Sequence, residues 1–223
     1  MSAGILPRQD IARLIATGAI TGLSSPDDGP PAVQPASLDL CLGATAYRLR
    51  ASFLPGQGRT VMEAISAVAM HQIDLTAGAV LETGCVYLLP LGEALDLPKD
   101  ITGLANPKSS TGRLDVFTRV ICDGSERFDA IPAGYSGPLY MEVAPRTFPV
   151  LVRPGDRLGQ IRFRRGDHQV LDTQHVSIDL QGAGPGSVIG YRARRHSGMV
   201  DLAGIGAHRA EEFWSPLTAP DGT

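Results

Sequence analysis

The spacing of apolar residues near the start of the chain predicts a short amphipathic helix. Ile11, Leu14 and Ile15 lie at positions i, i+3 and i+4, which places them on one helical face. Pro7 precedes this stretch and Gly18 follows it, and these residue types are common at the first turn and just beyond the end of a helix.

Strand patterns dominate the rest of the chain. After residues 23–35, whose Ser, Pro, Asp and Gly predict a loop, Leu38 and Leu40 begin the alternation of a β-strand. Further short apolar runs are separated by glycine and proline, as in an all-β barrel or sandwich. These runs are residues 86–91, 117–121, 139–143, 148–152 and 158–163. We therefore expect a β-domain with short helices over residues 1–167, followed by a polar tail over residues 168–223.

The composition agrees with a β-rich globular protein. The 223 residues include 26 glycines and 17 prolines, a density that argues against a helical bundle. Hydrophobic residues make up 43% of the chain, enough for a core, and no apolar run approaches the ~20 residues of a membrane helix. The first ten residues lack the pattern of a secretory signal, so we expect a cytoplasmic protein with no membrane partner.

Charge and cysteine content narrow the possible partners and cofactors. The net charge of −3 provides no general field for nucleic acid, so a polyanionic ligand would need a local site. Cys41, Cys85 and Cys122 are widely spaced and odd in number, which predicts buried, reduced thiols rather than disulfides or a zinc ribbon. The motifs of zinc-dependent nucleobase deaminases, of P-loop enzymes and of serine hydrolases are absent.

The first candidate site is the segment at residues 106–113, N-P-K-S-S-T-G-R. Asn106 is a favoured N-cap and Pro107 a favoured first helical residue, so the following peptide N–H groups would point outward, as in anion sites. A lysine, three hydroxyl groups and an arginine surround them, and Ser109 and Arg113 would share one helical face. A capped helix start on the surface explains the same pattern.

The second candidate is Glu142, a carboxylate in an otherwise uncharged strand pattern. Leu139, Met141 and Val143 would face one side of the strand, and Tyr140 and Glu142 the other. A buried glutamate here would be a candidate general acid or base near neutral pH. For a lone glutamate, exposure on the solvent face of an edge strand is the more frequent alternative.

Four segments in this order give the chain a resemblance to the deoxycytidine triphosphate deaminases. They are residues 34–40 (Q-P-A-S-L-D-L), 108–113 (K-S-S-T-G-R), 134–142 (G-Y-S-G-P-L-Y-M-E) and 153–160 (R-P-G-D-R-L-G-Q). The match covers roughly residues 5–163. The resemblance implies a distorted antiparallel β-barrel of the deoxyuridine triphosphatase-like (β-clip) type, assembled as a homotrimer with active sites between subunits.

The resemblance also implies a reaction and a set of site residues. The reaction is metal-free deamination of dCTP to dUTP and ammonia, on the path to thymidylate, with Mg²⁺ carried by the triphosphate and no zinc. Glu142 would move protons, and Ser109 and Arg113 would lie beside the base and the water. Further substrate contacts are expected at Lys108, Ser110, Thr111, Asp129, Tyr140, Met141, Gln160, Tyr191 and Arg194.

Two departures from the family pattern leave alternatives open. Pro132 stands where the family usually has an aspartate that contacts the sugar, and we expect Asp129, rather than Asp123, to replace that contact. The tail is either a lid that closes over the triphosphate or the stub of a second barrel copy. The alternative functions are a bifunctional deaminase-diphosphatase that yields dUMP and a nucleotide-binding paralogue without turnover.

Overall fold

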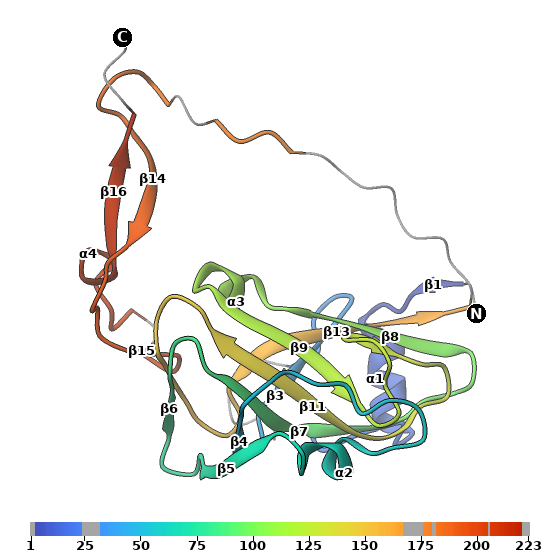
Figure 1. Cartoon of the computed structure of the whole chain (residues 1–223). Coiled ribbons are helices and arrows are strands. Elements are labelled where there is room, and N and C mark those ends of the chain that lie inside the picture. Colours follow the sequence, from blue (N-terminus) through green and yellow to red (C-terminus); the bar gives the residue numbers. More distant parts are fainter. Residues whose placement is uncertain (1–2, 24–31, 167–175, 180–181, 205, 220–223) are drawn as a thin grey trace.

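The computed structural model describes residues 3–23, 32–166, 176–179, 182–204 and 206–219 (Figure 1). Helix α1 (Arg8–Ala16) begins after Pro7 and ends just before Gly18, which has a φ of +79°. The predicted helix is therefore confirmed, and Ile11 and Leu14 on its apolar face are buried. Most of the loop predicted at residues 23–35 lies outside the described residues.

Two antiparallel sheets form the body of the molecule. The first contains, in order, β1 (Gly4–Ile5), β13 (Arg157–Arg165), β8 (Ile101–Pro107) and β10 (Ala130–Ile131), with β3 (Leu38–Cys41) also paired to β13. The second contains β5 (Ala69–Asp74), β4 (Thr45–Leu49), β7 (Val86–Asp96), β11 (Ser136–Pro145) and β9 (Val116–Cys122), with β2 (Ile20–Thr21) also paired to β7. All five predicted apolar runs overlap strands of the structure, so the all-β prediction is confirmed.

Smaller elements complete the described part of the chain. A third sheet contains β15 (Val200–Asp201), β12 (Val150–Val152) and β6 (Ala79–Leu81), and a separate hairpin pairs β14 (Val188–Ala193) with β16 (Trp214–Thr218). The short helices are α2 (Val61–Ile65), α3 (Ser109–Arg113) and α4 (Ala210–Phe213). Figure 1 shows the β14–β16 hairpin standing beside the barrel, while β15 pairs in parallel with β12.

Strand β11 lies between β7 and β9 and is buried on both faces from Leu139 onward. Leu139, Met141 and Val143 belong to the main core, and Tyr140 belongs to a second apolar cluster that also contains Leu88. The predicted alternation of these residues is confirmed. Because apolar residues cover both faces there, a polar residue in this part of the strand is enclosed whichever way it points.

The cysteines are free thiols, as predicted. Cys41 and Cys122 are buried, and burial raises the pKa of the Cys122 thiol to about 11. Cys85 is only partly buried, so the prediction of burial is wrong for this residue, which lies in the turn before β7. None of the helices in the described ranges combines the length and apolar character needed to cross a bilayer.

Candidate active site

Glu142 is buried and paired with an arginine on the neighbouring strand. The β11–β9 register places Glu142 directly opposite Arg119. Both Nε and Nη2 of Arg119 donate to the same carboxylate oxygen, Oε1, over 3.1 Å and 2.5 Å. The Glu142 side chain is only 2% exposed. The alternative of an exposed glutamate on an edge strand is therefore wrong, because β11 has a partner strand on each side.

The guanidinium of Arg119 is held by two further contacts. Its carbon lies 3.7 Å from the centre of the Phe128 ring, within the range of a cation–π contact. Its Nη2 also donates to the Ser52 hydroxyl over 2.7 Å. The second carboxylate oxygen of Glu142, Oε2, is buried and has no hydrogen-bond partner in the described part of the chain. Such an oxygen is costly to bury unless a ligand or water satisfies it.

Asp129 shares the electrostatic surroundings of this pair. Burial raises its pKa and nearby Glu142 adds to the rise, whereas a hydrogen bond from the Val120 N–H and the charge of Arg119 lower it. The Val120 N–H donates to Oδ1 over 2.8 Å, and the Asp129 backbone has a positive φ of 63°. Asp129 therefore lies close to Glu142, and its role as a sugar contact stays a prediction.

A polar cavity of about 350 Å³ lies where β8 meets α3. Its lining residues carry amide, hydroxyl, carboxylate and ammonium groups; they are Gln34, Ser37, Asp39, Lys108, Ser109 and Gln160. The Lys108 ammonium donates to the buried Asp39 carboxylate. The Ser37 hydroxyl donates to Oε1 of Gln160 over 3.0 Å. Two predicted substrate-binding residues, Lys108 and Gln160, thus lie with the predicted catalytic residue Ser109 at a cavity large enough for a phosphate chain.

The predicted capping of this segment is wrong. Asn106 and Pro107 are the last residues of strand β8, and the N-cap of α3 is Lys108. The fixed φ of proline is compatible with the end of a strand as well as with the start of a helix, so the motif alone does not decide between them. Ser109 and Arg113 do lie within one short helix, and both are exposed.

Two predicted substrate contacts have structural roles in this chain. Thr111 is 2% exposed, and its hydroxyl donates to the Leu158 carbonyl over 2.8 Å. Met141 is fully buried in the main core because it alternates with Glu142 along β11. Contact of these two residues with substrate stays a prediction. Tyr140 is also buried, and burial raises the pKa of its phenol.

One chain does not bring Glu142 together with Ser109 and Arg113. No hydrogen bond or ion pair joins these residues among those described. Arg119, the partner of Glu142, lies three residues along β9 from Val116, or about 10 Å from the end of the strand next to α3. The carboxylate and the α3 residues therefore form two separate parts of a candidate site.

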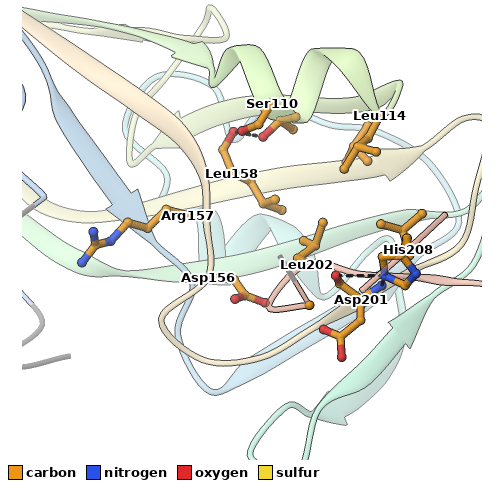
Figure 2. Close-up of a pocket in the computed structure, with 12 residues that line it drawn as sticks. Ser110, Leu114, Asp156, Arg157, Leu158, Asp201, Leu202 and His208 are labelled. Atoms are coloured by element: carbon orange, nitrogen blue, oxygen red, sulfur yellow. Dashed lines mark hydrogen bonds between the residues drawn. The ribbon is translucent and has the colours of Figure 1, made fainter. Parts of the chain in front are cut away.

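The tail lines a second cavity, of about 240 Å³, on another side of α3 (Figure 2). It lies between Ser110 and Leu114 near α3, Asp156 at the start of β13, and tail residues that include Asp201 and His208. His208 accepts a hydrogen bond from the Asp201 N–H over 2.9 Å. Of the predicted substrate-binding residues, the cavity contains Ser110 together with the structural Thr111.

The predicted tail contacts lie on the β14–β16 hairpin and its end. Tyr191 on β14 is 64% exposed. Arg194 follows β14, and its Nε donates to the Trp214 carbonyl over 3.3 Å. Neither residue lines the cavity at Lys108. Their contact with a triphosphate stays a prediction.

Two family models match this chain. The family model "2'-deoxycytidine 5'-triphosphate deaminase (DCD) N-terminal domain" matches residues 2–167, and the model of the C-terminal domain of the same enzyme matches residues 160–223. The chain belongs to the deoxycytidine triphosphate deaminase family. The resemblance seen in the four sequence segments is thereby confirmed.

Relatives in this family share both sequence and fold with the chain. The crystal structure of 2'-deoxycytidine 5'-triphosphate deaminase from Agrobacterium tumefaciens is 46% identical, with a TM-score of 0.89 over 98% of this chain and 72% of that one. A dCTP deaminase of Ignicoccus hospitalis is 34% identical over 47% of this chain. That match spans about half of the relative's own length (54%). A dCTP deaminase of Halorubrum lacusprofundi is 27% identical over 71% of this chain and 76% of its own length.

Residues that the sequence pattern did not single out also surround the candidate site. Arg119 stood within a run treated as apolar, and Asp39 within the strand marked by Leu38 and Leu40. In both cases, a charged side chain within an apolar strand pattern was a usable signal. Ser52 and Phe128 lie outside regular strands, and only the fold brings them to Arg119. The described residues contain no cluster of three or more His, Cys, Asp or Glu side chains arranged to hold a metal ion.

Proposed function

We propose that the protein deaminates dCTP hydrolytically to dUTP and ammonia, and so supplies deoxyuridine nucleotide for thymidylate synthesis in the cytoplasm. The observation that carries this proposal is the buried Glu142, which has one oxygen held by Arg119 and the other without a hydrogen-bond partner among the described residues. Membership of the deaminase family supports the choice of substrate.

Deamination at C4 requires that both protons of the attacking water be moved, one to ring N3 and one to the exocyclic nitrogen. The water oxygen bonds to C4 of cytosine while one water proton passes to the Glu142 carboxylate and then to ring N3. The second proton then leaves the new C4 hydroxyl and passes through the same carboxylate to the exocyclic nitrogen. The C4–N bond breaks, ammonia departs and C4 keeps a carbonyl oxygen. One carboxylate oxygen able to accept and return a proton is sufficient for this sequence, and Oε2 is such an oxygen.

The triphosphate is assigned to the cavity at Lys108. The Lys108 ammonium can donate charge-assisted hydrogen bonds to phosphate oxygens, and the Ser109 hydroxyl can donate a neutral one. The side-chain amide of Gln160 is a further donor at the same cavity. The Asp39 carboxylate orients the ammonium at the cavity edge. Mg²⁺ enters as part of the nucleotide substrate, bound to its phosphate oxygens, as is usual for nucleoside triphosphates.

The separation of Glu142 from α3 supports an active site shared between subunits. In a closed trimer, a repeated interface can place Ser109 and Arg113 of one copy beside Glu142 of the next. The arginine charge would then stabilise the negative charge that develops on the ring during water attack. We therefore propose a homotrimer with three shared sites.

Ammonia release from purified protein, dCTP and Mg²⁺ tests the reaction. Wild-type protein should release ammonia, and Glu142→Gln should lower kcat by about three orders of magnitude or more while nucleotide binding persists. Near-normal turnover by Glu142→Gln would refute the mechanism. Phosphorus NMR of the products separates the alternatives, because a deaminase-diphosphatase also releases pyrophosphate and a non-catalytic paralogue binds nucleotide without releasing ammonia.

Mixing two variants of low activity tests the shared site. Glu142→Gln and Ser109→Ala subunits, unfolded and refolded together in equal amounts, should regain about a quarter of wild-type activity, because about one interface in four then combines an intact Glu142 with an intact Ser109. Each variant refolded alone is the control. A lack of recovery in mixed trimers would show that both residues act within one chain.

A further inference from the structure

We propose that Arg119 is a positioning residue that locks the Glu142 carboxylate, so that Oε2 alone performs both proton transfers. This inference rests on the proposed deamination and adds a residue to it. It follows from an asymmetry in the structure: one oxygen of Glu142 accepts two N–H groups of Arg119, and the other accepts none from the described residues.

The contact of both nitrogens with one oxygen restricts rotation of the carboxylate. A carboxylate with a single donor can turn about its terminal torsion and exchange its oxygens. Here Nε and Nη2 are parts of one rigid, planar fork, and both point to Oε1. Exchange of Oε1 and Oε2 would break both hydrogen bonds together. The fork therefore fixes which oxygen stays open.

The fork itself is fixed from several segments of the chain. Arg119 extends from β9, the Phe128 ring lies against its guanidinium face at 3.7 Å, and Ser52 accepts from Nη2 at 2.7 Å. Phe117 lies near the guanidinium as well, with its ring centre 5.0 Å away. Side chains that are locked in this way hold reacting groups within a fraction of an ångström of the productive geometry.

The same geometry shows what Arg119 is able to do for the reaction. Its N–H groups to Glu142 are both directed at Oε1, and none of them donates to the open oxygen, Oε2. It thus acts through Glu142 and not through contact with the reacting atoms. Misplacement of a catalytic group by about 1 Å typically costs about 100-fold in rate, so loss of the fork should affect kcat far more than KM.

The experiment compares Arg119→Ala and Arg119→Lys with wild type for ammonia release from dCTP. We expect Arg119→Ala to lower kcat by about 100-fold with KM changed less than about 3-fold. Added guanidinium ion at non-denaturing concentration should restore part of the lost kcat. Arg119→Lys keeps the charge but loses the rigid fork, so it should lose about 10-fold in kcat.

Arg48→Lys is the matched control. Arg48 also extends from a strand of the same sheet and lies over an aromatic ring, that of Tyr87 at 5.5 Å, but it has no hydrogen bond with Glu142. This variant should keep wild-type kcat and KM. Thermal unfolding of every variant shows whether loss of activity reflects loss of the fold.

Three outcomes would overturn the inference. Wild-type kcat in Arg119→Ala would show that the fork is dispensable, and a rise in KM at constant kcat would show that Arg119 binds substrate. If Arg119→Ala does not fold, Arg119→Lys decides, and wild-type kcat in that variant would exclude a role for the fork. Failure of the proposed function is a distinct result, because wild-type protein would then release no ammonia from dCTP.

Discussion

Phe213 of the tail packs edge-on against Phe148 of the barrel, with ring centres 5.3 Å apart and an interplanar angle of 88°. Trp214 approaches the same ring from a second direction at 5.1 Å. Phe148 is 1% exposed and Phe213 6% exposed. The tail is therefore anchored to the main core by Phe213 and Trp214, although the β14–β16 hairpin stands beside the barrel.

This anchoring predicts that the tail and the barrel unfold together. Phe213→Ala should lower the free energy of unfolding by about 3–5 kcal/mol, because it removes a buried ring from a tight aromatic cluster. Urea denaturation followed by tryptophan fluorescence measures the change. Tyr191→Ala, an exposed aromatic position on the hairpin, is the control and should change stability by less than about 0.5 kcal/mol. Equal stability of both variants would show that the tail is not anchored.

Thr111 and Ser109 lie two residues apart, but substitution of Thr111 should lower stability, whereas substitution of Ser109 should lower activity. Thr111→Val leaves the buried Leu158 carbonyl without its donor, so it should lower stability by about 1–3 kcal/mol and leave kcat/KM close to wild type. Ser109→Ala removes an exposed hydroxyl at the proposed phosphate cavity, so it should lower kcat/KM at nearly unchanged stability. Thermal unfolding and the ammonia assay separate the two. A loss of kcat/KM in folded Thr111→Val would show that this residue also belongs to the substrate site.

Local patterns predicted most of the fold but only part of the site. The helix at Ile11 and Leu14 and the alternation around Glu142 depend on near neighbours in sequence, so periodicity revealed them. The burial of Glu142 depends on β7 and β9, and its pairing with Arg119 depends on a strand register between distant segments. Sequence spacing carries little information about such long-range pairing, which explains why Arg119 was missed.

Titration of Glu93 should make the free energy of unfolding depend on pH, and a glutamine at this position would remove that dependence. Burial raises the pKa of this carboxyl group, and the Cys41 N–H, which donates to both of its oxygens, opposes the rise. The folded protein thus holds this proton more tightly than the unfolded chain. Its stabilising contribution is fully present below the ordinary glutamate value of about 4.3 and is lost as pH rises through the raised value.

Glu93→Gln removes that titration. Relative to wild type, the variant should therefore gain stability as pH rises from about 4 to about 8, because only wild type loses a favourable protonated state. Asp129 and Asp156 also have raised pKa values, but both proteins retain them, so their difference isolates Glu93. Urea unfolding across this pH range measures the difference. Glu211→Gln, an exposed position, should stay parallel to wild type. A constant difference for Glu93→Gln would contradict the assignment.

The two lysines of the chain provide a matched test of the triphosphate site. Lys108 lies at the cavity with its ammonium held by Asp39, whereas Lys99 is exposed in the turn between β7 and β8. Lys108→Ala should raise KM for dCTP by about 10- to 100-fold, the loss expected for a charge-assisted hydrogen bond worth about 1.5–3 kcal/mol. It should change kcat little, since the phosphates do not react. Lys99→Ala should leave both constants unchanged. If Lys108→Ala lowers kcat at constant KM, or if Lys99→Ala has the larger effect on KM, the triphosphate does not bind in this cavity as proposed.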